Sequence, residues 1–175
     1  MRLFRYKKER KLETNEIETI KMHFTKMPLT LPTGTMIYHG SHEVVKSPMD
    51  FMYYGIPKAC GIFFAFPDTP SDQEMFLNHY EVTEDITLID GSRFTNRDPK
   101  PKKLIKAIKK QKVDGSINPI YSKNDNDFLL DDCMYEILLS DTSKIKFVGS
   151  EKLKPDDRIN SLSEMTYCAG FSLKE

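Results

Sequence analysis

The segment MYEILLS, residues 134–140, places one acidic residue in the middle of an apolar strand. Side chains alternate between the two faces of a strand. One face carries Tyr135, Ile137 and Leu139, and the other carries Met134, Glu136, Leu138 and Ser140. Both faces are apolar around Glu136, and an unpaired buried carboxylate is costly. This residue is therefore a functional group, a glutamate at a strand edge, or one half of an ion pair with a lysine.

Other segments surround this strand with further strands and helices. GIFFAF, residues 61–66, is apolar throughout and predicts a strand buried on both faces, which Pro67 ends. SDQE, residues 71–74, has the spacing of a capping box and predicts a helix from about residue 72 to residue 79. Residues 42–60 are expected to form a loop-rich segment, and residues 28–35 a connection into a strand that ends at His39.

The remaining segments give a mixed pattern. Residues 80–90 predict one or two strands, DGSINPIY a turn into a strand, and KIKFVG a closing strand. KPKKLIKAIKKQK, residues 100–112, predicts an amphipathic helix with Leu104, Ile105 and Ile108 facing inward, and residues 7–27 predict another helix. Helices and strands do not alternate regularly, which favours an α+β fold over a doubly wound α/β sheet.

Composition restricts the class of protein. The chain has 175 residues, enough for one domain with its own core, and 26 basic residues balance 26 acidic ones. Three cysteines without a CxxC pair argue against a disulfide framework and fit a reducing compartment. No signal peptide and no apolar run near the roughly 18 residues of a membrane span is present, so we expect a cytoplasmic protein, in its own cell or in a host if it is an injected effector.

Two histidines lie three residues apart in YHGSHE, residues 38–43. A zinc site would need a further ligand, for which Cys60 or His79 are candidates, but no recognised ligand spacing is present. The sequence therefore favours no metal. His39, at a strand end followed by glycine, is either an ordinary buried histidine or a ligand contact.

Taken together, YHGS, GIFFAF, KVDGSI and YEILLSDTSKI occur in an order that resembles the ADP-ribosyltransferase superfamily, in the branch with a His-Tyr-Glu triad. The resemblance spans about residues 34–149 and implies a split β-sandwich with flanking helices. Residues 1–33 would form an N-terminal helical extension and residues 150–175 a polar C-terminal tail.

The resemblance also implies a reaction and its residues. The family transfers ADP-ribose from NAD to an acceptor and releases nicotinamide. Glu136 would be the catalytic carboxylate and His39 would orient NAD. NAD would also contact Gly40, Ser41, Phe63 and Ser71. For Ser71, the cap of the predicted helix is favoured over the NAD contact.

Two departures from the family pattern are relevant. Phe63 stands where the family has the triad tyrosine, which keeps a stacking face and loses the hydroxyl. Met134, two residues before Glu136, does not support arginine as the acceptor. Seven lysines within residues 100–112 are interpreted as a solvated helix face, with a phosphate or nucleic-acid contact as the alternative, since some members of the family modify DNA or RNA. Four aspartates within residues 125–132 favour a protein acceptor over nucleic acid.

Three alternatives remain open from the sequence. The chain could be a degenerate member that binds NAD or ADP-ribose without turnover, an RNA 2′-phosphotransferase-like enzyme, or a small α+β interaction module with an accidental resemblance. We expect a monomer that binds no membrane.

Overall fold

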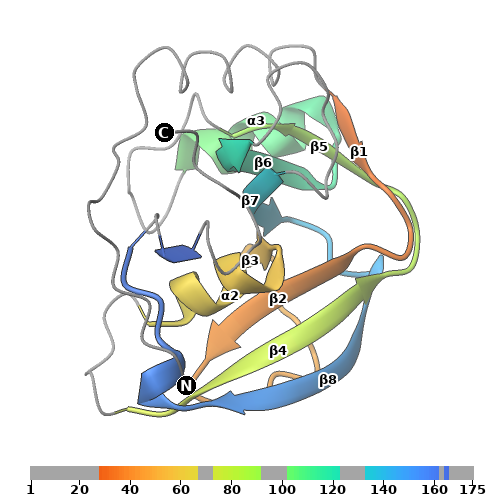
Figure 1. Ribbon diagram of the computed structural model, residues 1–175. Coiled ribbons are helices and arrows are strands. Elements are labelled where there is room, and N and C mark those ends of the chain that lie inside the picture. The colour runs from red at the N-terminus through yellow and green to blue at the C-terminus, as the bar shows by residue number, and fades with distance from the viewer. Residues whose placement is uncertain (1–27, 67–72, 92–101, 123–132, 162–163, 166–175) are drawn as a thin grey trace.

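The computed structural model describes residues 28–66, 73–91, 102–122, 133–161 and 164–165, and it has an α+β fold (Figure 1). One eight-stranded sheet has the strand order β1-β5-β6-β7-β3-β2-β4-β8. The strands are β1 (Leu29–Leu31), β2 (Met36–Ser41), β3 (Met52–Ile56), β4 (Met75–Val82), β5 (Ile86–Asp90), β6 (Gly115–Ser122), β7 (Cys133–Leu139) and β8 (Ile145–Leu153). The helices in this part of the chain are α2 (Lys58–Ala65), α3 (Lys102–Gln111) and the short 3-10 helix η2 (Pro155–Asp157).

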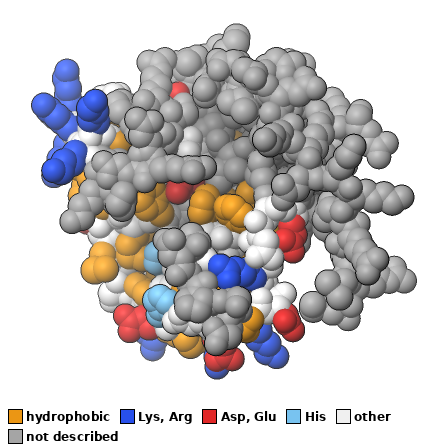
Figure 2. Space-filling model, turned by 90° about the vertical axis from the view of Figure 1, so that its left-hand side faces the viewer, with side chains coloured by type: hydrophobic (Ala, Val, Ile, Leu, Met, Phe, Trp, Pro, Cys, Tyr) orange, Lys and Arg blue, Asp and Glu red, His pale blue; other side chains and the backbone are white. Residues whose placement is uncertain are grey.

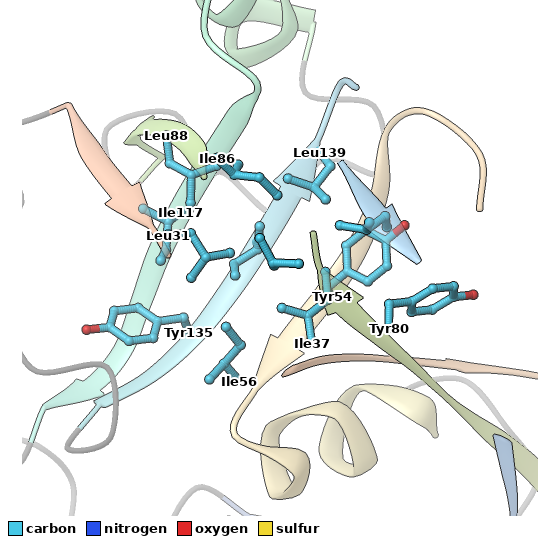
Figure 3. Close-up of a cluster of buried hydrophobic side chains, with 13 residues drawn as sticks. Leu31, Ile37, Tyr54, Ile56, Tyr80, Ile86, Leu88, Ile117, Tyr135 and Leu139 are labelled. Carbon is cyan, nitrogen blue, oxygen red and sulfur yellow. The ribbon is translucent and has the colours of Figure 1, made fainter. Parts of the chain in front are cut away.

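Strand β7 has the predicted alternation. Its residues on one face lie in the largest buried cluster, which the strands of the curled sheet enclose (Figure 3). This face contributes Tyr135, Ile137 and Leu139, and the cluster also holds Leu31, Ile37, Tyr54 and Tyr80 from other strands. Met134 and Leu138, on the other face, are buried in two separate clusters. The enclosed cluster on one face and helices α2 and α3 on the other explain why both faces of β7 are apolar.

Several other predicted elements are confirmed. β6 and β8 lie where the sequence places strands, and β5 accounts for the second half of residues 80–90. Helix α3 buries Leu104 and Ile108 and leaves its lysines exposed. The helix predicted for residues 7–27 lies outside the described residues.

The strand predicted for GIFFAF is wrong, because residues 58–65 form helix α2. β3 lies in the sheet between β2 and β7, and it comes from a segment for which the sequence predicted a loop. A Cβ built on Gly55 would lie 2.5 Å from the Gly61 backbone nitrogen, so two glycines let the helix pack directly on β3. An apolar run of this length does not distinguish a buried strand from a buried helix.

The helix predicted for residues 72–79 is also wrong, because β4 begins at Met75. β4 pairs along its whole length with β8 and along most of it with β2, so tertiary pairing overrides the local capping signal. Ser71, the predicted cap, lies outside the described residues.

Both predicted flanking ranges contribute to the sheet. β1 pairs with β5, although it lies in the range expected to be an N-terminal extension. β8 continues to Leu153, within the expected tail, and beyond it Ile159 and Met165 are buried against α2. The Arg158 guanidinium donates a 2.6 Å hydrogen bond to the Phe66 carbonyl at the end of that helix. Single apolar residues separated by polar ones give no periodic signal, which is why the sequence did not predict this packing.

Candidate functional site

Strands β2 and β3 are joined by a single residue pair, Tyr38 with Gly55, whereas β2 pairs with β4 over six residues. We call this junction the seam. β3 continues from the seam along β7, and β2 continues along β4 (Figure 1). His39 and Gly40 follow Tyr38 directly, so both predicted ligand residues lie where the two strands separate.

The backbone of Gly40 faces the seam. The Val82 N–H donates to the Thr35 carbonyl at 2.9 Å, which makes residue 35 a hydrogen-bonded position of the β2–β4 ladder. Such positions alternate along an antiparallel pair, so Tyr38 and Gly40 direct their N–H and C=O groups away from β4. Tyr38 meets Gly55 on that side. The Gly40 groups point to the side on which β3 has diverged.

The His39 imidazole bridges the two strands. Its Nδ1 lies 2.7 Å from the Tyr53 carbonyl oxygen, and because a carbonyl only accepts, Nδ1 carries the proton. The neutral ring then has an acceptor lone pair on Nε2. Burial lowers the pKa of His39, and the bond to Tyr53 opposes this shift in part. The ring is therefore neutral near pH 7, with its tautomer fixed.

Helix α2 crosses the seam at backbone contact distance. A Cβ built on Gly40 would lie 2.3 Å from the Ala65 Cβ and 2.4 Å from the Ala65 Cα. Since real Cβ atoms do not approach so closely, Gly40 is required by the helix that packs on it. The sequence showed the glycine but not this reason for it.

Glu136 lies on β7, which β3 separates from β2. Along β7, it lies between a residue that packs against α2 and a residue that packs against α3. Met134, two residues before it on the same face, packs against Ala59 and Cys60 of α2. Leu138, two residues after it, packs against α3. Glu136 itself is only half-buried. The carboxylate therefore occupies the stretch of β7 that neither helix covers completely.

The surroundings of Glu136 favour its protonated form. Burial raises the pKa of Glu136, and a hydrogen bond from the Asn118 side chain, opposite it on β6, partly offsets the rise. No cation in the described ranges contributes to the pKa of Glu136. The ion-pair explanation for Glu136 thus has no support among the described residues, while its hydrogen bond to Asn118 satisfies part of its polar surface.

The register relates His39 to Glu136. Tyr38, Gly55 and Glu136 are successive partners across β2, β3 and β7, so their side-chain positions share one face of the sheet. His39 is one residue further along β2 and starts from the other face, from which its ring reaches Tyr53. The two residues are thus two strands apart, about 10 Å at ordinary strand spacing, and leave the sheet on different faces.

A buried asparagine that the sequence did not reveal fixes the segment after His39. Asn78 on β4 is fully buried, and its Nδ2 donates to the His39 and Glu43 carbonyls, both at 3.3 Å, and to the Ser41 hydroxyl at 2.9 Å. Its Oδ1 accepts from the Val45 N–H at 3.0 Å. Ser41 in turn donates to the Glu43 carbonyl. Both the amide and the hydroxyl serve to hold residues 39–45 in place.

Phe63 does not lie on a strand beside His39. It is on α2, where it packs with Phe64, at 5.2 Å between ring centroids, and against the cluster that holds Met134, Ile159 and Met165. Phe63 and Glu136 therefore lie on the same face of the sheet. Ser71, the remaining predicted NAD contact, cannot be placed because it is outside the described residues.

The residues considered as metal ligands are separated. His42 contacts the Gln73 side chain, and His79 contacts Glu151, which also pairs with Lys58. Cys60 is fully buried and its thiol donates to the Tyr135 carbonyl; burial, with the nearby Glu136 charge, raises its pKa far above the usual range. No group of three or more His, Cys, Asp or Glu side chains in the described ranges could hold a metal ion.

Comparison with known proteins adds no relative: no family model, no curated protein and no solved structure matches the chain. Within the ranges that the structure describes, no helix has the length and apolar character needed to cross a membrane.

Proposed function

We propose that the protein is an NAD-dependent mono-ADP-ribosyltransferase that works at the seam and at Glu136. The observation that carries this proposal is the single-pair junction of β2 and β3 beside His39 and Gly40. It agrees with the split sheet that the sequence resemblance implies. It also leaves the N–H and C=O groups of Gly40 without a ladder partner on β3.

The roles follow from the groups at the seam. The Gly40 backbone would bind the amide of nicotinamide, donating one hydrogen bond and accepting another. Nε2 of His39 would accept a hydrogen bond from a ribose hydroxyl, since Nδ1–H is already committed to Tyr53. Phe63, on the same face as Glu136, would supply an aromatic surface.

Glu136 would act on the bond that breaks. The C1′–N bond to nicotinamide cleaves with its electron pair leaving on nicotinamide, and the sugar gains positive charge at C1′. An ionised Glu136 would stabilise this charge and bind the neighbouring 2′-hydroxyl. The acceptor then bonds to C1′ and loses a proton. From the acidic sequence of residues 125–132, which lies outside the described residues, we expect a protein acceptor.

The test is nicotinamide release from NAD by the purified chain, followed by chromatography. We expect release in the wild type and a loss of about 100-fold or more in Glu136→Gln, since the variant keeps the shape and removes the charge. Glu81→Gln, the same chemical change on β4, is the matched control and keeps activity. Full activity in Glu136→Gln would exclude this mechanism.

A second candidate is an NAD- or ADP-ribose-binding module without turnover. The register favours it, because His39 and Glu136 leave the sheet on different faces. Here calorimetry would detect NAD binding that His39→Ala weakens, with no nicotinamide release at any protein concentration.

A further inference from the structure

Helix α3 presents a dense cationic face that the proposed transferase does not use. Six exposed lysines lie on its outward side and at the residue that follows it, and Figure 2 shows Lys and Arg side chains projecting as a group at the upper left of the molecule. They are Lys102, Lys103, Lys106, Lys109, Lys110 and Lys112, and we call them the lysine face. The chain as a whole is neutral, so this face is a local feature rather than a result of net charge.

Nothing in the described part of the chain neutralises the lysine face. The ion pairs given there use Lys58, Lys144 and Lys152, and the first turn of α3 has no acidic residue. Like charges three and four residues apart destabilise a helix. This repulsion is unfavourable for folding, and a bound anion would reduce it beyond what dissolved salt does.

The fold holds this face rigidly outward. Leu104 and Ile108 are buried against Leu138 of β7 and Ile89 of β5, so the inner side of α3 cannot rotate away from the sheet. Successive lysines at 102, 106 and 110 then follow one row, each separated by four residues, or about 6 Å along the axis. A rigid, evenly spaced row of cations suits a ligand with regularly repeated negative charge.

An aromatic ring lies beside this row. Phe51 is only partly buried, packs against the cluster under α3, and lies with its ring centroid 5.7 Å from Lys109 Nζ. Its backbone φ of 65° is in the left-handed region, which is uncommon for phenylalanine. Cations that follow a phosphate backbone, next to an aromatic side chain on which a base can stack, are the features of single-strand binding.

A membrane surface fits less well. Binding in the plane of a bilayer requires apolar side chains on the exposed face of the helix. The large exposed apolar residues of the described ranges are Val44, Met49 and Val148, none of them on α3. We therefore propose that the lysine face, with Phe51, binds single-stranded nucleic acid through its phosphate backbone. This binding is independent of the proposed ADP-ribose transfer.

The experiment measures fluorescence anisotropy of a labelled oligo(dT) with the full chain across a salt series. With about four lysines engaged, the slope of log K against log salt should be near −3. Lys102→Gln/Lys106→Gln/Lys110→Gln should weaken binding by roughly tenfold or more and reduce the slope by about 2. Glutamine is a good helix former, and circular dichroism checks that α3 stays folded.

The matched control is Lys46→Gln/Lys146→Gln/Lys154→Gln, which removes the same charge from exposed lysines elsewhere and should leave binding unchanged. Phe51→Leu should lower the affinity without changing the salt slope, and Glu136→Gln should change neither. Absence of binding at low salt, equal losses in the two triple variants, or tighter binding to a duplex or to phosphatidylserine vesicles would overturn the proposal. Because none of these readouts uses NAD, failure of the proposed transferase activity leaves the test intact.

Discussion

His39 donates Nδ1–H to the backbone carbonyl of Tyr53, 2.7 Å away on the next strand. A side chain thus occupies the position at which a continued β2–β3 ladder would form its next backbone bonds. This single contact fixes the ring tautomer and spans the seam.

The pKa of His39 predicts an acid limit to stability. Its folded pKa is lowered below 6.5, so the unfolded chain binds the proton more readily. The free energy of unfolding should therefore fall as the pH drops below 6.5 through the lowered value. In His39→Asn, whose amide can donate to Tyr53 but does not titrate, this part of the decline should be absent. Urea unfolding at a series of pH values measures it, and an unchanged pH profile in the variant would contradict the assignment.

The pKa of Glu136 predicts the opposite slope. Its folded pKa is raised above 4.5, so the folded protein binds the proton more tightly and loses stability as the pH rises from 4.5 through the raised value. Glu136→Gln should lack this loss and be more stable than the wild type at neutral pH. Thermal unfolding at pH 4 and pH 7 compares the two proteins, with Glu81→Gln as control. A less stable Glu136→Gln at pH 7 would show that the carboxylate has a stabilising partner.

Gly40→Ala should destabilise the fold by about 1–3 kcal/mol, because the new methyl group overlaps Ala65. The double variant Gly40→Ala/Ala65→Gly should recover little, since the Ala65 Cα would also lie 2.4 Å from the added atom. Gly149→Ala on β8 is the control, because a Cβ there meets nothing within 4 Å. Denaturant midpoints measure all three. Equal stability of Gly40→Ala and Gly149→Ala would disprove the close approach of α2.

Asn78→Ala should cost about 1–3 kcal/mol, because it leaves part-buried backbone groups of residues 39–45 without their partner. Asn78→Asp should cost more, since it places a carboxylate oxygen against three acceptor oxygens. Asn160→Ala, on an exposed residue, is the control and should be neutral. The order of the three midpoints is the measurement, and Asn78→Asp more stable than Asn78→Ala would refute the donor role of Nδ2.

The sequence predicted the elements with strong periodicity. The alternation around Glu136 and the apolar stripe of α3 depend on local spacing, and both are confirmed. The strand prediction for GIFFAF was wrong because tertiary contacts decide the conformation of this segment. Gly55 and Gly61 are in different segments of the sequence, and their close contact lets helix α2 pack on β3. β4 was missed because a local capping signal competed with pairing to two distant strands.

The site was only partly accessible to sequence reasoning. His39, Gly40 and Glu136 were proposed from short motifs, yet the placement of His39 and Glu136 on different faces depends on the register of three strands, which no motif encodes. Asn78 gave no signal, since one asparagine in an apolar segment is ordinary until its partners are known.

Strand β7 occupies the middle of the sheet, between β6 and β3, but it is among the last strands to be synthesised. Until residues 133–139 leave the ribosome, β3 and β6 each have an open edge facing the missing strand. Such edges pair readily with other chains. A chain that terminates before β7 would therefore lack Glu136 and would also expose two unpaired strand edges, on β3 and β6. Addition of β7 to the sheet thus removes two edges at which this protein could self-associate.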